Sequence, residues 1–579
     1  MNKDTKKPKK KPQTNIFSLL KPYKWFIVLL VVFTIAGNAL SLLVPKIIAS
    51  GIDEYTKGHF VYTNLLIEFL VVTAFIFIFT YVQSIVQTFT SERAAKDLRE
   101  QIAAKISQQS YAYVQTTTSS KLLTNLTSDV DAVKQFIAQA IATLISSIFL
   151  IIGASILLLM TNWQLGLVVL LIVPIIGITF AVVLKKVREL FMKTQAVIDR
   201  LNKIINESIL GAALIRVLNS EKLEYTKFAK ANTDAKDIGL QILGYFATLI
   251  PIITFVASLA SLAILVLGGH FVIAGSMSLG DFAAFSSYLT ILIFPIIMIG
   301  FMSNVIAQST ASYQRIDSVL QEPVKEALGV ITEPLKGNIE VKDISLLFGE
   351  KQALKDVSFT VKAGTRTAII GPTAAGKTQL LYVLNGLTEP NKGTVAYDGK
   401  SIAMYDKKSL HQQVGFVFQD SIIFNMSLRE NISFSEIVKD ADLEKAIETA
   451  ELTDFIHKLP KKLDTIVSER GTSLSGGQKQ RIMLARALAL NPKILLLDDF
   501  TARIDANTEK KILENVKKHY PDLTLLSVTQ KIDSVKDYDQ IILLMEGEVI
   551  AKGKHKDLMK SSPEYVQLYE SQQSTSHYE

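Results

Sequence analysis

Two adjacent aspartates, Asp498 and Asp499, end a run of aliphatic residues in the stretch ILLLDDFTARID, residues 494–505. A buried strand followed by acidic residues brings carboxylates to the edge of a sheet. The first carboxylate of such a strand commonly holds Mg²⁺, and a longer glutamate beside it usually acts on water. Asp499 is shorter than glutamate by one methylene. The stretch therefore predicts a metal ligand at Asp498 and leaves the role of Asp499 open.

A second stretch, TRTAIIGPTAAGKTQLLYVLNGL, has the composition of a phosphate-binding loop. Its spacing satisfies the G-x-x-x-x-G-K-[ST] pattern between an apolar strand and a helix, as that pattern requires. Backbone N–H groups and the helix N-terminus would converge on phosphate, while Lys377 adds positive charge and the Thr378 hydroxyl can ligate Mg²⁺. The predicted cradle comprises Gly371, Pro372, Thr373, Ala374, Ala375, Gly376, Lys377, Thr378 and Gln379.

A third stretch, LSGGQ at residues 474–478, opens a basic, strongly helical run. Ser475 can cap that helix, and the following glycines, Gly476 and Gly477, let backbone approach an anion closely. Taken alone, the pattern is more typical of a capped surface helix than of a binding site.

The composition indicates a membrane protein. Of 579 residues 49% are hydrophobic, and the mean hydropathy is +0.29, which is high for a soluble protein. The absence of cysteine excludes disulfides, zinc knuckles and thiol nucleophiles. The net charge of +8 does not indicate a nucleic-acid partner, because no basic stretch is interleaved with aromatic residues. The basic start, MNKDTKKPKKKPQ, is not typical of a cleaved signal peptide.

Six apolar segments in the first half are long enough to cross about 30 Å of hydrocarbon as helices of about 20 residues. Lysine and arginine collect on the cytoplasmic side of membranes. The basic N-terminal run and the polar stretches 89–136 and 188–242 are therefore expected inside, which predicts a multi-pass plasma-membrane protein. Prolines within the apolar segments predict kinks. The segments are 24–47, 63–88, 137–160, 165–187, 243–268 and 279–305, and the prolines are Pro45, Pro174, Pro251 and Pro295.

Together these stretches resemble the ATP-binding-cassette family. Gly371 to Thr378, Gln419 in VGFVFQD, LSGGQ and LLLDD occur in the order and spacing of that family, and six membrane segments ahead of one cassette resemble an exporter half-transporter. The stretches SSKLLTNLTSDVDAV and NESILGAALIRVL resemble its coupling loops. The implied fold is a six-helix transmembrane domain followed by an α/β P-loop NTPase domain with an inserted helical subdomain. The expected divisions are a basic N-terminal segment 1–23, a transmembrane domain 24–310, a linker 311–332 and a cytoplasmic cassette 333–579.

The resemblance also assigns roles to residues. In that family two cassettes pack head to tail, and each ATP lies between the phosphate loop of one and the LSGGQ of the other. The implied ligands of Mg²⁺ are Thr378, Gln419 and Asp498, and Phe348 would stack on adenine. The residues implied to touch ATP held by a partner chain are Ser475, Gly476, Gly477 and Gln478.

The sequence departs from the family pattern where the chemistry occurs. Glutamate usually follows the metal-holding aspartate, and histidine usually stands at the position of Gln530. A carboxylate withdrawn by roughly 1 Å can cost on the order of 10²-fold in rate, and an amide does not titrate. Further departures are Ala374 for glycine, Gln379 for Ser or Thr, and ARID for SALD. The chain should therefore bind ATP and hydrolyse it weakly at Asp499.

The intact LSGGQ suggests that this chain serves a partner's competent site. The expected assembly is a heterodimer with a second half-transporter that has the glutamate and the histidine; a homodimer with two slow sites is the alternative. The expected function is ATP-driven export of small amphipathic compounds out of the cell by a chain embedded in the lipid bilayer, with drugs as the family-level expectation. A homodimeric lipid or peptide exporter, a regulatory ATP-binding subunit and a gate for a passive channel remain as rival hypotheses.

Overall fold

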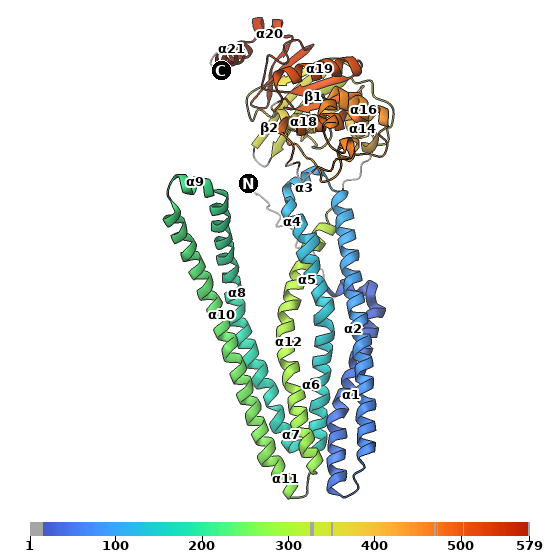
Figure 1. Cartoon of the computed structure of the whole chain (residues 1–579), viewed down its shortest axis with the longest axis vertical. Helices are drawn as coiled ribbons and strands as arrows, with labels where there is room; N and C mark the ends of the chain where they lie inside the picture. Colours follow the sequence, from blue (N-terminus) through green and yellow to red (C-terminus); the bar gives the residue numbers. More distant parts are fainter. Residues whose placement is uncertain are drawn as a thin grey trace, which may run out of the picture. The chain divides into compact units, whose positions relative to one another are not determined.

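Long apolar stretches fold as helices in the first of two units of this computed structural model (Figure 1). The structure describes residues 16–324, 329–348, 351–467, 471, 473–501 and 503–576, with backbone alone at Met192, Phe348 and 574–576. The first unit comprises Met1–Gln108 and Thr117–Pro323, and the second comprises Gln109–Thr116 and Val324–Glu579. Part of the expected basic segment, residues 1–15, lies outside the described residues.

Six helical stretches among the described residues are long and apolar enough to span a membrane. They are Ile16–Thr56, Tyr62–Ser107, Ser119–Thr161, Trp163–Leu210, Glu221–Ile273 and Leu279–Leu320. Their elements are η1 (Ile16–Tyr23), α1 (Lys24–Thr56), α2 (Tyr62–Ser107), α4 (Ser119–Thr124), η2 (Asn125–Asp129), α5 (Val130–Gln135), η3 (Phe136–Ala140), α6 (Ile141–Thr161), α7 (Trp163–Leu170), α8 (Ile172–Leu210), α10 (Glu221–Ala263), η4 (Ile264–Gly268), α11 (Gly269–Ile273) and α12 (Leu279–Leu320). The short helix α9 (Ala212–Val217) joins α8 to α10.

These helices continue well past the length that a bilayer requires. The 46 residues of α2 make it about 70 Å long at about 1.5 Å per residue. α2 and α8 run through residues 89–107 and 188–210, as the polar helical pattern there predicts. α12 continues to Leu320, ten residues into the segment 311–332 that was expected to be a linker, because that stretch keeps apolar residues such as Ile316 and Val319 on a buried face.

Proline shapes the spans in two ways. α7 ends at Leu170, four residues before Pro174, where the pyrrolidine ring would clash with a helical carbonyl. Pro45, Pro251 and Pro295 instead lie inside α1, α10 and α12. In these helices neighbouring groups must satisfy the carbonyls that proline cannot pair.

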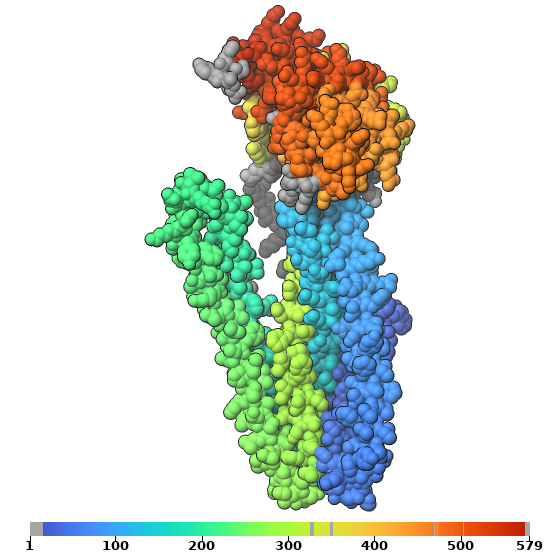
Figure 2. All heavy atoms as spheres, viewed as in Figure 1, coloured from blue at the N-terminus to red at the C-terminus, as the bar shows by residue number. Residues whose placement is uncertain are grey.

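Close approach between spans depends on small residues. α1 packs on α2, α8 on α10, and α12 on α1 and α6. A Cβ at Gly280 of α12 would lie 2.1 Å from the Ala49 carbonyl oxygen of α1, so only glycine fits there. The α8–α10 pair diverges from α12 toward its α9 end (Figures 1 and 2).

The second unit contains two sheets and two hydrophobic cores, one on each face of the larger sheet. Residues of the antiparallel sheet belong to one of these cores. The antiparallel sheet has the order β2-β1-β4-β5. In the larger sheet, β10-β9-β3-β8-β7-β6, all strands are parallel except β10. The strands are β1 (Ile339–Phe348), β2 (Lys351–Val361), β3 (Arg366–Ile370), β4 (Lys392–Tyr397), β5 (Lys400–Ser401), β6 (Val414–Val417), β7 (Ile494–Asp498), β8 (Thr524–Val528), β9 (Gln540–Met545) and β10 (Glu548–Gly553).

The helices of the second unit cover the larger sheet and form the expected inserted subdomain between β6 and β7. The inserted helices are α15 (Leu428–Ser433), α16 (Asp440–Thr449), α17 (Thr453–His457) and α18 (Gly476–Ala489). The remaining helical elements are α3 (Tyr111–Thr117), α13 (Lys377–Leu384), η5 (Ile402–Met404), α14 (Lys407–Gln413), η6 (Lys462–Asp464), α19 (Ala506–His519), α20 (His555–Ser561) and α21 (Pro563–Ser576). Since β3, β7 and β8 are parallel neighbours, the residues after their carboxyl ends meet at one edge.

Candidate nucleotide site

The predicted phosphate loop joins β3 to α13 and depends on two glycines. A Cβ at Gly371 would lie 1.9 Å from the Leu544 carbonyl oxygen, and one at Gly376 would lie 2.5 Å from the Ala353 carbonyl oxygen. Gly376 also has a φ of +95°. Both positions therefore exclude any side chain. Ala374 has a φ of +65°, a left-handed conformation that costs an L-residue roughly 1–2 kcal/mol.

Lys377 is the first residue of α13 and lies across the loop. Its Nζ donates hydrogen bonds of 2.8 Å to the carbonyl oxygens of both Gly371 and Pro372. Burial lowers the pKa of Lys377, and the carboxylates of Asp499 and Asp498 act in the opposite direction. The cation is thus held within the loop by backbone acceptors, beside the two acids.

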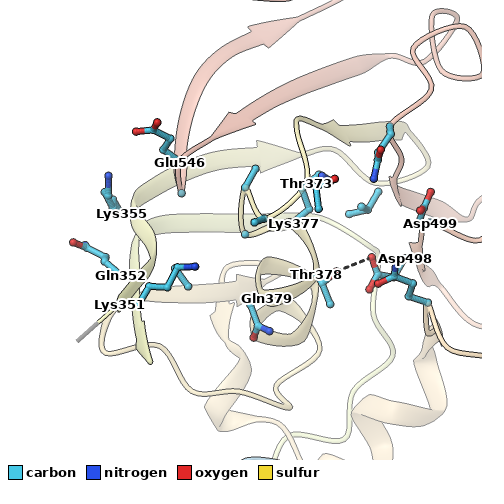
Figure 3. Close-up of a pocket in the computed structure, with 18 residues that line it drawn as sticks. Lys351, Gln352, Lys355, Thr373, Lys377, Thr378, Gln379, Asp498, Asp499 and Glu546 are labelled. Atoms are coloured by element: carbon cyan, nitrogen blue, oxygen red, sulfur yellow. Dashed lines mark hydrogen bonds between the residues drawn. The ribbon is translucent and has the colours of Figure 1, made fainter. Parts of the chain in front are cut away.

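Asp498 ends β7 in a buried position. Its side chain accepts a 3.1 Å hydrogen bond from Thr378 Oγ1 (Figure 3), and the residue is only 1% exposed. Burial raises the pKa of Asp498 to about 6, against the opposing hydrogen bond from Thr378. Its Oδ2 has no hydrogen-bond partner among the described residues.

These residues fit a magnesium ion. An ionised buried carboxylate requires a positive partner, and Mg²⁺ is usually held by one or two carboxylates together with substrate phosphates. Thr378, Gln419 and Asp498 line one cavity of about 590 Å³ together with Lys377. No group of three His, Asp or Glu side chains within the described part of the chain could hold a metal alone. The arrangement therefore suits a metal that arrives with nucleotide.

Asp499 follows Asp498 in an unusual backbone conformation. Its φ is +47°, a left-handed value that aspartate adopts more readily than most residues. Its N–H donates a 3.0 Å hydrogen bond to the Val528 carbonyl oxygen of β8. Burial raises the pKa of Asp499, and the charges of Lys377 and Lys531 oppose that rise.

Gln530 lies on the neighbouring β8 side of the same cavity. The Gln572 side chain of α21 donates a 2.7 Å hydrogen bond to the Gln530 carbonyl and accepts one of 3.0 Å from the Ile532 N–H. The backbone that carries Gln530 is thereby fixed. The structure thus brings together Asp498, Asp499 and Gln530, which the sequence analysis treated as one site.

The LSGGQ residues lie elsewhere in the second unit. Ser475 Oγ accepts a 3.2 Å hydrogen bond from the Gln478 N–H, while Gln478 Oε1 accepts one of 2.9 Å from the Ser475 N–H. This reciprocal cap confirms the predicted capping of α18. A Cβ at Gly476 would lie 2.9 Å from Arg503 Cδ, so the arginine stem crosses the first turn. Among the described residues, those of LSGGQ do not line the 590 Å³ cavity.

Several cavity residues were missed from the sequence. β2 contributes Lys351, Gln352, Ala353 and Lys355, and the β9–β10 turn contributes Glu546 and Gly547 (Figure 3). Only the sheet topology brings these segments to the phosphate loop. The positive φ values of Glu546 and Gly547 mark a tight turn, which the glycine could have indicated. Phe348, expected to stack on adenine, ends β1, and its side chain lies outside the described residues.

Comparisons with known proteins agree with this architecture. Residues 27–296 match the ABC transporter transmembrane region, and residues 354–502 match the ABC transporter family of ATP-binding domains. The chain is 32% identical to the uncharacterized ABC transporter ATP-binding protein YfiB of Bacillus subtilis, over 96% of this chain and 98% of the relative. It is 29% identical to the probable multidrug resistance ABC transporter ATP-binding/permease protein YheI of Bacillus subtilis, over 96% of this chain and 98% of that protein.

Two further likenesses extend the comparison. An ATP-dependent lipid A-core flippase of Syntrophus aciditrophicus is 29% identical over 85% of this chain and 83% of the flippase. A solved structure of a bacterial Atm1-family ABC exporter with ATP bound covers 96% of this chain and 99% of that chain, with a TM-score of 0.78 at 23% identity. At that identity the structural likeness shows the fold alone. The chain belongs to the ABC transporter family, as an exporter half-transporter in which a six-span transmembrane region precedes one ATP-binding domain.

Proposed function

We propose that this ATP-driven exporter subunit binds ATP and Mg²⁺ at a site of weak hydrolysis and lends its LSGGQ to a competent site on a different half-transporter. The observation that carries this proposal is Asp499. It occupies the position after the metal-binding aspartate, but its carboxylate has a short arm on a left-handed backbone. Gln530 beside it cannot titrate. The two groups expected to handle the proton of an attacking water are therefore both altered.

Hydrolysis requires a base at a defined place. Water attacks the γ-phosphorus, the bond to the β-phosphate oxygen breaks, and the water proton passes to a base within about 2.6–3.2 Å. Mg²⁺, when bound, would neutralise charge on the phosphates. Lys377 and the loop N–H groups orient the phosphates, and Thr378, Gln419 and Asp498 would hold the metal. A base withdrawn by roughly 1 Å loses on the order of 10²-fold in rate.

Exposed apolar side chains support assembly with a partner. Four side chains at the α9 end of the α8–α10 pair are 61–80% exposed in the single chain: Leu210, Leu214, Val217 and Leu218. An exposed apolar cluster of this kind usually marks a protein interface. The LSGGQ glycines likewise lie outside the chain's own cavity. Both features suit a dimer in which ATP closes the cassettes and the long helices transmit closure to the membrane spans.

The proposed orientation places the N-terminus and the ATP-binding domain in the cytoplasm, on the strength of the lysine and arginine distribution. A small amphipathic substrate is proposed because a relative is named as a probable multidrug transporter. A homodimeric lipid exporter is the second candidate, supported by the relative named as a lipid A-core flippase.

Transport into inside-out membrane vesicles tests export against the rival roles. In vesicles that hold this chain together with a competent partner half-transporter, ATP should drive accumulation of an uncharged amphipathic dye, and Lys377→Ala should abolish it through loss of the phosphate contact. A regulatory subunit would give no accumulation in either form. Conductance without ATP would indicate a passive channel and contradict the export proposal.

A further inference from the structure

A polar cavity lies within the transmembrane unit, at the meeting of α2, α6 and α12. Its volume is about 280 Å³. Gln83 and Gln87 of α2 face it together with Thr143, Ser146 and Ser147 of α6. Leu150, Phe294 and Met298 form apolar parts of the same wall. None of the described residues that line the cavity is charged.

Two of these polar groups already have protein partners. Ser146 Oγ donates a 3.1 Å hydrogen bond to Asn38 Oδ1 of α1. Gln87 Nε2 donates to the Ala138 carbonyl oxygen, which lies in the π-helical turn η3. π-Helical turns of this kind occur frequently at functional sites. These bonds join α6 to α1 and α2 to η3 beside the cavity.

The other polar groups are not accounted for by packing. The side chains of Gln83, Thr143 and Ser147 make no hydrogen bond to other described residues, and Ser147 is only 3% exposed. Gln83 and Thr143 are half-exposed. Because all three side chains line the cavity, they are available to water or to a polar part of a ligand.

The lining offers both kinds of hydrogen-bonding group. The glutamine amides and the hydroxyls can donate, and the amide and hydroxyl oxygens can accept. No lining side chain could neutralise an ammonium or a phosphate.

The size of the cavity limits what it can hold. Its volume is near the lower end of the roughly 300–1,000 Å³ of a site for a whole drug-sized molecule, so it suits part of an amphiphile better than the whole molecule. The apolar body would lie against Phe294, Leu150 and the adjoining hydrocarbon. This arrangement selects an amphipathic molecule whose buried end is uncharged.

We propose that this cavity binds the uncharged, hydrogen-bonding head group of the transported molecule, of the carboxamide or hydroxyl class. The proposal rests on the export function proposed above and narrows its substrate class to neutral amphiphiles. Cationic amphiphiles of the same length should bind poorly there, because no charged side chain in the wall compensates the free-energy cost of removing their charge from water.

The absence of native cysteine allows a direct test. The full chain carrying Ser147→Cys is placed in lipid nanodiscs, and the rate of its reaction with N-ethylmaleimide is measured. N-dodecylacetamide should slow the reaction several-fold, whereas dodecyltrimethylammonium at equal concentration should not. Ile148→Cys is the matched control, since Ile148 is 51% exposed and lies outside the cavity wall; neither amphiphile should protect it. Thr143→Cys serves equally if Ser147→Cys does not fold.

Equal protection by both amphiphiles, protection by neither, or a folded variant that never reacts would overturn the proposal. Gln83→Glu sharpens the test, because the new carboxylate should shift protection toward the cationic amphiphile; an unchanged preference would also count against the cavity. The assay needs no ATP hydrolysis. The vesicle experiment tests export, and the N-ethylmaleimide experiment tests binding in the cavity. The two proposals can therefore fail independently.

Discussion

The Thr378 hydroxyl donates a 3.1 Å hydrogen bond to Asp498 although 120 residues separate them in the sequence. Thr378 begins the helix after the phosphate loop, and Asp498 ends a strand that is not adjacent to β3 in the sheet. The contact joins two motifs that sequence can only propose separately. It also holds the Thr378 hydroxyl and the Asp498 carboxylate within hydrogen-bonding distance of each other, as two ligands of one metal ion would be.

Removal of that hydroxyl should weaken metal-dependent nucleotide binding. Thr378→Val keeps the shape of the side chain and loses the hydrogen bond and the metal contact. We expect ATP affinity in the presence of Mg²⁺ to fall about 10- to 100-fold, with little change in its absence. Isothermal titration calorimetry measures both. Thr378→Ser retains the hydroxyl and should bind nearly as the native chain does; an equal loss in both variants would argue against the metal role.

Magnesium-dependent binding should also depend on pH through Asp498. Its pKa is raised to about 6, and Mg²⁺ requires the ionised carboxylate. The ionised fraction falls as pH drops through that value, so affinity should fall by up to about tenfold per pH unit below it. ATP itself gains protons in this range. Asp498→Asn therefore serves as the control, and the native chain should show the steeper pH profile in fluorescence binding titrations.

A pH profile of the native chain parallel to that of Asp498→Asn would contradict this assignment. Mg²⁺ binding would then not require the ionised Asp498 carboxylate.

The left-handed Ala374 should tolerate glycine well. Ala374→Gly relieves roughly 1–2 kcal/mol of backbone strain and adds about 0.5–1 kcal/mol of flexibility in the unfolded chain. The melting temperature of the full chain should therefore stay level or rise. Ala375 lies next to it without a positive φ and is 3% exposed, so Ala375→Gly should lower the melting temperature. A drop of equal size for both variants would show that Ala374 is not strained.

Local patterns predicted much of this protein and failed at identifiable points. The six spans follow from long apolar runs. The phosphate loop follows from the spacing of its glycines and lysine between a strand and a helix. A kink was expected at Pro174, and the structure instead interrupts the helix at Leu171, because a proline ring clashes with the carbonyl about one turn earlier. The end of α12 extends ten residues further than expected, since its buried face continues to Val319.

The missed part of the site has one physical cause. Ala353 and Gly547 reach the phosphate loop only because β2 and the β9–β10 turn lie against it in three dimensions. The residue pattern of neither segment indicates that it contacts the phosphate loop. The left-handed backbone conformation of Asp499 could not be predicted either, because the sequence shows only that the residue is an aspartate. That conformation matters for engineering, since glutamate adopts it less readily than aspartate does.

The measurement that tests the central claim most directly is ATP hydrolysis by the purified chain in lipid, once ATP binding is established. It is compared with a form carrying Asp499→Glu and Gln530→His, and melting temperatures of both forms control for strain at the left-handed position. We predict ATP binding with little turnover in the native chain and an increase on the order of 10²-fold in the double variant. Robust turnover by the native chain alone would contradict the account and indicate a working homodimer.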